Sequence, residues 1–119
     1  MYSDSYLQQL WRKAVKKYRG DRCAICYKTP VEIHHIVKRR NAILRHDYRN
    51  GIPLCKDCHN KAHTIELTND IYSLINDDID YLMGKEAWLF KDYLVKNGMT
   101  KKEFLEEKVK ELKGVIGGL

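Results

Sequence analysis

Cys23-Ala-Ile-Cys26 and Gly51-Ile-Pro-Leu-Cys55-Lys-Asp-Cys58-His59 flank Val31-Glu-Ile-His-His-Ile-Val37, and these three stretches decide the fold of this 119-residue chain. Each Cys-x-x-Cys pair forms a turn that brings two thiolates onto one ion. Four thiolates complete a tetrahedral Zn²⁺ sphere and leave no position for substrate, so we expect structural zinc. Disulfides are disfavoured because the first ten residues lack the apolar stretch of a signal peptide. Redox cysteines or an iron–sulfur cluster are the alternatives.

The segments around the cysteines predict a small α+β core. A helix is expected over about residues 5–19, where apolar residues recur at helical spacing. The β-branched run over 31–37 predicts a strand, and 51–54 predicts a second short strand. The stretch 38–50 reads as a polar loop, and a helix is expected from about 56 to 64. The predicted order is therefore strand, loop, strand, helix.

The rest of the chain reads as helical. An apolar stripe over 71–82 ends at Gly84, a second helix spans about 85–96, and Thr100 opens a third with a capping box. The glycine-rich tail over 114–119 is expected to fray. Apolar and aromatic residues here are expected to form core or interface, and none makes a convincing platform for base stacking.

Charge is divided unevenly along the chain. The net charge is +6, but Lys and Arg outnumber Asp and Glu by 14 to 5 over residues 1–64 and are outnumbered 8 to 11 over 65–119. A basic half suits a polyanion, although it is also compatible with an ordinary solvated surface. We therefore expect a core over 1–66 and a helical extension over 67–119 that serves dimerisation or docking. The sequence offers no apolar run long enough for a membrane span, so a cytoplasmic protein is expected, in a host cytoplasm if the source is viral.

Four of the five histidines, all but His46, fall at the strand end or just after the second cysteine pair. His59 and His63 are four residues apart on the expected helix and so share one face. His34 and His35 are neighbours at a strand end, where only one can point inward unless the strand kinks. Zinc at the helix start would pin the helix against this strand.

The cysteine pairs, His34-His35, Asn50 and the Cys58-His59 junction, in this order, resemble the cysteine-rich branch of the HNH endonucleases. The resemblance covers residues 10–64. It implies a ββα-metal fold that hydrolyses a phosphodiester bond with one divalent cation, Mg²⁺ or Mn²⁺. By position, His35 matches the general base, and Asn50 matches a residue that braces the loop and orients the base.

The same resemblance assigns the remaining histidines. His34 and His59 match the ligands of the catalytic cation, and His63 either supports that metal or touches the phosphate. Some relatives carry Asp at the position of His34, and imidazole here suits Mn²⁺, Ni²⁺ or Co²⁺ as well as Mg²⁺. Glu32 is either a carboxylate that holds a histidine tautomer or an exposed strand residue. Candidate phosphate clamps follow in the loop: Arg39, Arg40, Arg45 and Arg49.

Several alternatives stay open from the sequence. A non-catalytic zinc module that binds DNA or protein would keep the cysteines and the basic face, but it would not need the histidines and Asn50 together. His59 or His63 could replace a cysteine on zinc. The substrate could be double-stranded or branched DNA, or RNA. Small nucleases of this family are common in bacteriophages and mobile elements, which would make a recombination or packaging protein a natural partner.

Overall fold

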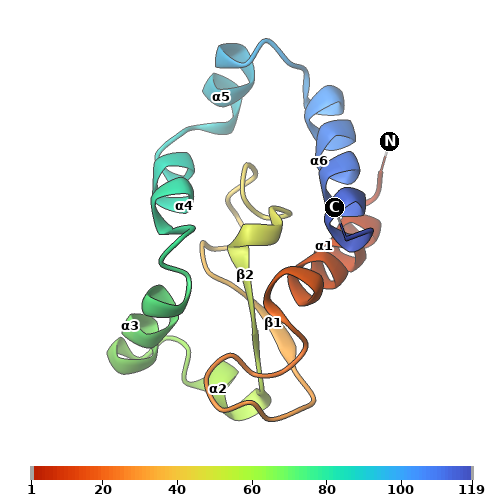
Figure 1. Cartoon of the computed structure of the whole chain (residues 1–119). Coiled ribbons are helices and arrows are strands. Elements are labelled where there is room, and N and C mark those ends of the chain that lie inside the picture. The colour runs from red at the N-terminus through yellow and green to blue at the C-terminus, as the bar shows by residue number, and fades with distance from the viewer. Residues whose placement is uncertain (1, 119) are drawn as a thin grey trace.

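The computed structural model describes residues 2–118, which form a two-stranded sheet, six α-helices and one short 3₁₀ helix (Figure 1). The elements follow in the order α1 (Asp4–Arg19), β1 (Glu32–His35), η1 (Tyr48–Asn50), β2 (Gly51–Leu54), α2 (Lys56–Asn60), α3 (Ile65–Leu74), α4 (Ile79–Glu86), α5 (Phe90–Lys96) and α6 (Lys101–Ile116). This mixture of helices with a small sheet confirms the predicted α+β class. None of the described helices combines the length and apolar character that a bilayer crossing needs.

Helix α1 confirms the first predicted helix. The Ser3 side chain caps its start by accepting from the backbone N–H of Tyr6, and Gly20 ends it with a φ of 98°. The buried face carries Leu7, Trp11, Ala14 and Val15. This face packs against the sheet and against α6, so α1 forms one wall of the domain.

Strands β1 and β2 pair antiparallel, with Glu32 opposite Leu54 and His35 opposite Gly51. Side chains alternate between the two faces of a strand. Ile33 and His35 therefore face α1, whereas Glu32, His34 and Ile36 face the opposite side. Strand β2 has the predicted bounds, and β1 is shorter than the predicted 31–37 because β2 supplies only four partners.

Gly51 sets how closely α1 approaches the sheet. A Cβ atom at this position would lie 2.6 Å from Val15 Cγ2 and 2.8 Å from Trp11 Cζ2, well inside van der Waals contact. Only a residue without a side chain lets the helix sit this close. Because Gly51 is paired with His35, the close approach also brings Trp11 beside the His35 ring.

The predicted helix boundaries beyond residue 65 are partly wrong. The apolar stripe over 71–82 is divided between α3 and α4, with a break over 75–78, and Gly84 lies inside α4 rather than at its end. Asn and Asp residues occupy positions 76–78 and favour turns over helix interiors. Asp78 is also held outside α3 as a partner of Tyr18 and Arg19, at 2.8 and 3.1 Å. Helix α5 starts only at Phe90, and α6 continues to Ile116, past the predicted start of fraying.

The C-terminal helices complete the hydrophobic core. Ile71, Ile75 and Leu82 are buried in one cluster with Leu44 and Ile52. Helices α3 to α6 follow one another around the sheet, and α6 returns to lie against α1 (Figure 1), with Leu112 buried beside Trp11. The capping box that was predicted at Thr100 begins α6. The 67–119 segment is thus packed on the rest of the chain, and its separate role in docking stays a prediction.

Candidate active site

The four cysteines form one cluster at the end of the sheet. Their Sγ atoms all lie within 4.8 Å of one another. Cys26 Sγ is 3.5 Å from Cys55 Sγ and 3.9 Å from Cys58 Sγ. A tetrahedral Zn²⁺ with bonds of about 2.3 Å places its sulfur ligands about 3.8 Å apart, so these cysteines are positioned to bind one metal ion. Burial alone would raise the pKa of Cys23, but backbone N–H donors around it lower that pKa to about 6 and favour the thiolate.

Three histidines gather beside this cluster, on the face of β1 that His34 occupies. The His34 ring lies 5.2 Å from that of His59 and 5.8 Å from that of His63, between ring centroids. His63 does not share a helix with His59 as predicted, because α2 ends at Asn60 and the chain turns before Thr64 caps α3. The turn nevertheless leaves the His63 ring near His34.

Two electrostatic features favour a ligand role for these rings. Burial, and then the positive charge that His59 and His63 would carry, lowers the pKa of His34 to about 4. Its ring is therefore neutral near pH 7 and keeps a lone pair for a metal. Glu32 Oε1 lies 3.2 Å from His59 Nδ1 and is the predicted carboxylate partner of a histidine. This contact fixes the Nδ1–H tautomer of His59 and leaves its Nε2 free.

His35 points to the other face of β1. Its Nε2 lies 3.0 Å from the backbone carbonyl oxygen of Arg45, and its ring stacks on Trp11 with centroids 4.0 Å apart. Because a carbonyl only accepts, Nε2 carries the proton and Nδ1 keeps its lone pair. Burial lowers the pKa of His35, and nearby arginines add to this effect, so the neutral ring is favoured.

Asn50 is fully buried and ties the two ends of the loop together. Its Oδ1 accepts from the Val37 N–H at 2.6 Å, and its Nδ2 donates to the carbonyl oxygens of Val37 and Leu44, each at 3.0 Å. Its own carbonyl oxygen accepts from the Ile36 N–H at 3.2 Å. The side chain therefore closes the loop that delivers the Arg45 carbonyl to His35.

Residues 21–64 match the family model for HNH endonuclease. This segment, less than half of the chain, is similar to the HNH endonuclease family. It contains both cysteine pairs, β1, β2, α2 and all the histidines of the site. The family that the segment matches is one of nucleases, which act on nucleic acids. No curated protein and no solved structure gives a significant match to the chain.

The four arginines of the loop over residues 38–50 (the HNH loop) differ in how exposed they are and in whether they form ion pairs. Arg40 is exposed, and Arg39 is exposed apart from an ion pair with Asp4. Arg45 is half-buried beneath His35. Arg49 is bound to Asp47 at 3.0 Å and stacks over the Tyr81 ring at 3.7 Å. Arg39 and Arg40 are thus the arginines best placed to meet a phosphate, while Arg49 serves to fix the loop.

The sequence analysis did not predict a role in the site for two residues, Trp11 and Asp47. Trp11 was expected only on the apolar face of a helix, yet it supports the His35 ring and donates its Nε1–H to the Asp47 carbonyl oxygen at 2.8 Å. Asp47 is fully buried and receives Arg49, Lys108 and the hydroxyl of Tyr81. The signal for Trp11 was its place in the stretch that resembles the family, ahead of the first cysteine pair.

Proposed function

We propose that the HNH domain hydrolyses phosphodiester bonds of DNA, with His35 as the general base. The observation that carries this proposal is the hydrogen bond from His35 Nε2–H to the Arg45 carbonyl oxygen. It fixes the tautomer in which Nδ1 can accept a proton from water, and the lowered pKa keeps the ring neutral near pH 7. His35 also directly follows His34 in β1, so the proposed base is next along the chain to the three histidines that would hold the cation, although the two rings lie on opposite faces of the strand.

His34, His59 and His63 would hold the catalytic cation. Imidazoles suit transition metals better than Mg²⁺, so we expect Mn²⁺, Co²⁺ or Ni²⁺ to support cleavage at lower concentrations than Mg²⁺. When bound, the cation supplies positive charge to the scissile phosphate and to the departing oxygen. Glu32 orients the His59 ring toward this role.

Other residues of the chain carry out proton transfer, loop support and phosphate binding. A water proton moves to His35 Nδ1 as the water oxygen attacks phosphorus in line, and the bond from phosphorus to the 3′ oxygen breaks. The departing 3′ oxygen takes a proton from solvent, so the products are a 5′-phosphate and a 3′-hydroxyl end. Asn50 holds the loop on which His35 depends, and Arg39 and Arg40 bind neighbouring phosphates.

The cysteine cluster would hold structural Zn²⁺, because its sulfur spacing fits a closed tetrahedral site. Replacing Cys55 with Ser is expected to release the metal and unfold the core, since structural zinc binding is coupled to folding. Circular dichroism with zinc quantification tests this. A folded, metal-free variant that still cleaves DNA would refute the structural role.

The function is tested by nicking of supercoiled plasmid with Mg²⁺, Mn²⁺, Co²⁺ or EDTA. His35→Ala is expected to lose cleavage and keep its zinc, whereas His46→Gln, at a buried histidine outside the cluster, is expected to cleave. Equal cleavage by the wild type and His35→Ala would refute the base. Binding without cleavage under every metal would favour a non-catalytic zinc module.

Substrate and setting remain predictions from the family resemblance. The substrate is predicted to be double-stranded DNA, branched DNA or RNA. The setting is predicted to be DNA processing or recombination in a phage or mobile element. The C-terminal helices, which carry more acidic than basic residues, are predicted to form a homodimer or to bind a protein partner. A branched junction and an RNA substrate in the same assay separate the substrates.

A further inference from the structure

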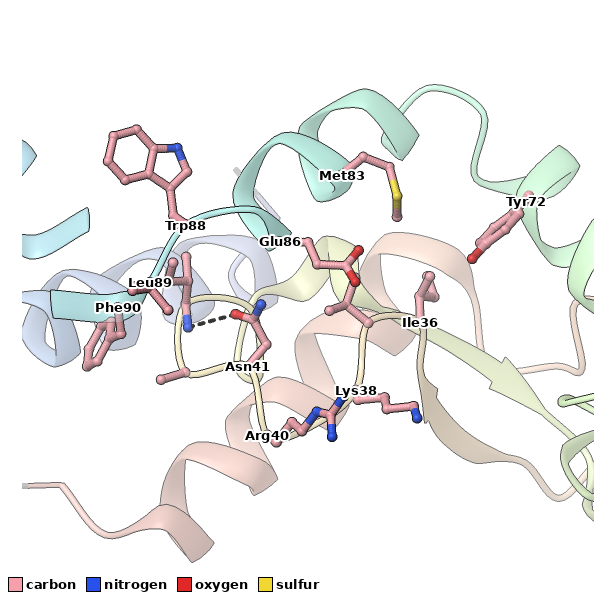
Figure 2. Close-up of a pocket in the computed structure, with 13 residues that line it drawn as sticks. Ile36, Lys38, Arg40, Asn41, Tyr72, Met83, Glu86, Trp88, Leu89 and Phe90 are labelled. Atoms are coloured by element: carbon pink, nitrogen blue, oxygen red, sulfur yellow. Dashed lines mark hydrogen bonds between the residues drawn. The ribbon is translucent and has the colours of Figure 1, made fainter. Parts of the chain in front are cut away.

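A groove of about 560 Å³ runs between the HNH loop and the C-terminal helices (Figure 2). Ile36, Lys38 and Arg40 line it on the loop side, and Tyr72, Met83 and Trp88 line it on the helix side. Tyr72 and Trp88 lie at opposite ends, and Met83 lies between them on α4. The groove therefore joins the basic loop to the aromatic residues of α3 and of the turn before α5.

One residue that lines the groove, Ile36, lies two residues after His34 in the chain. Ile36 follows β1 and still pairs with β2 through its N–H and the Asn50 carbonyl oxygen. Residues two apart on a strand point to the same side. Ile36 thus lies on the same face as His34, so a strand of nucleic acid cleaved at the histidines can continue into the groove.

The two sides of the groove offer complementary chemistry. Lys38 and Arg40 are exposed, and within residues 2–118 neither forms an ion pair. Trp88 is 40% exposed and Tyr72 is 37% exposed, so part of each ring is open to a ligand. The Trp88 ring makes an edge contact with Tyr93, with centroids 6.2 Å apart, which helps to hold the indole in place.

We propose that this groove binds an unpaired, single-stranded segment of the nucleic acid beside the scissile phosphate. The inference rests on the proposed nuclease function and specifies its substrate. Cations along a groove follow a sugar–phosphate backbone, and exposed aromatic rings stack on bases whose faces are free. In a duplex those faces are covered by neighbouring base pairs, so the aromatic side of the groove selects unpaired strands. The carboxylate of Glu86, also in the groove, can accept from a base amino group.

The groove is tested by fluorescence anisotropy with a short labelled oligo-dT and a duplex of equal length. The protein is the full zinc-loaded chain carrying His35→Ala, which prevents cleavage. Trp88→Ala and Arg40→Ala are each expected to weaken oligo-dT binding about tenfold, the range for one stacked base or a lost phosphate contact. Only Arg40→Ala is expected to weaken duplex binding. Lys102→Ala, an exposed lysine on α6, is the matched control and is expected to bind like the parent.

Intrinsic fluorescence gives a second readout that a merely structural role for Trp88 would not move. Of the two tryptophans, Trp11 is 1% exposed, so quenching by oligo-dT reports stacking on Trp88. We expect quenching in the parent and none in Trp88→Phe. Unchanged oligo-dT affinity in Trp88→Ala, or equal quenching in Trp88→Phe, would overturn the inference and leave the groove to a protein partner.

The outcomes separate this inference from the nuclease assignment. Cleavage that requires His35, together with oligo-dT binding that ignores Trp88, would refute the groove and keep the nuclease. Oligo-dT binding that requires Trp88, together with cleavage that ignores His35, would keep the groove and refute the assigned base.

Discussion

The His35 imidazole lies flat against the Trp11 indole, with ring centroids 4.0 Å apart and planes inclined by 12°. Gly51 permits this contact by letting α1 approach the sheet, and the Trp11 Nε1–H anchors the indole to the Asp47 carbonyl oxygen. The proposed base is therefore held on one side by a ring outside the HNH segment and on its edge by a loop carbonyl within it. This arrangement makes α1 part of the site.

Trp11→Ala is expected to lower the free energy of unfolding by about 4 kcal/mol and to reduce cleavage further than the loss of folded protein explains. Trp11→Phe keeps a ring under His35 and loses only the hydrogen bond, worth about 1 kcal/mol. Denaturant unfolding and single-turnover cleavage at saturating metal measure both effects. Equal cleavage by the folded fractions of the two variants would show that the stacking has no catalytic part.

Asn50→Asp is expected to destabilise the protein by about 3 kcal/mol and to abolish cleavage. The substitution keeps the size of the side chain but turns two donated hydrogen bonds into contacts between a carboxylate and carbonyl oxygens. Asn41→Asp is the matched control, because within residues 2–118 the Asn41 side chain accepts from the N–H groups of Ile43 and Leu44 and donates to none, and an aspartate can do the same. Similar losses in both variants would contradict the bracing role of Asn50.

The sequence predicted the HNH core well because its signals are local. Two Cys-x-x-Cys turns, a β-branched run and a glycine after the first helix each fix a short segment, and the structure confirms α1, β2 and the cysteine cluster. Asn50 holds the loop through its side chain, and its role in orienting the base stays a prediction from the family resemblance.

Contacts between distant segments could not be read in the same way. The apolar stripe over 71–82 has helical spacing throughout, and the partners of Asp78 in α1 help to explain why the turn-favouring residues at 76–78 break it. Arg49 reads as a free loop cation until Asp47 and Tyr81 are seen to surround it. The sequence does not indicate that Trp88 could stack on a base, because Lys38 and Arg40 lie far from it in the chain. Only the fold places the three residues in one groove.

Glu32→Gln is expected to raise the Mn²⁺ concentration for half-maximal cleavage roughly tenfold or more, because second partners of metal-bound histidines typically contribute 10- to 100-fold in affinity. The carboxylate contact to His59 Nδ1 is the cause. Glu66→Gln, at an exposed residue of α3, is the matched control. A titration followed by cleavage rate and by Mn²⁺ electron paramagnetic resonance tests this. Identical titrations for the two variants would remove Glu32 from the site.

Asp47 is expected to make the fold sensitive to acid. Burial alone would raise the pKa of Asp47, but the charge of Lys108 and the hydrogen bond from Arg49 outweigh it and lower that pKa. The folded pKa thus lies below the unfolded value of about 3.9, so the stabilisation is complete above that value and is lost as the pH falls through the folded pKa.

Asp47→Asn tests this linkage. The variant is expected to be less stable than the wild type at pH 7, and the difference between the two is expected to shrink as the pH falls below about 4. Denaturant midpoints measured at several pH values give the comparison. A difference that stays constant down to pH 2 would contradict the linkage.

The most direct test of the central claim is chemical rescue of His35→Gly by imidazole in the plasmid nicking assay. Removing a general base typically costs about 10²- to 10⁴-fold in rate, and imidazole can enter the space left beside Trp11. We predict that the variant keeps zinc, loses cleavage and regains part of it as imidazole is added, with no such gain for the wild type. Wild-type cleavage by His35→Gly without imidazole would contradict the assignment of His35 as the base.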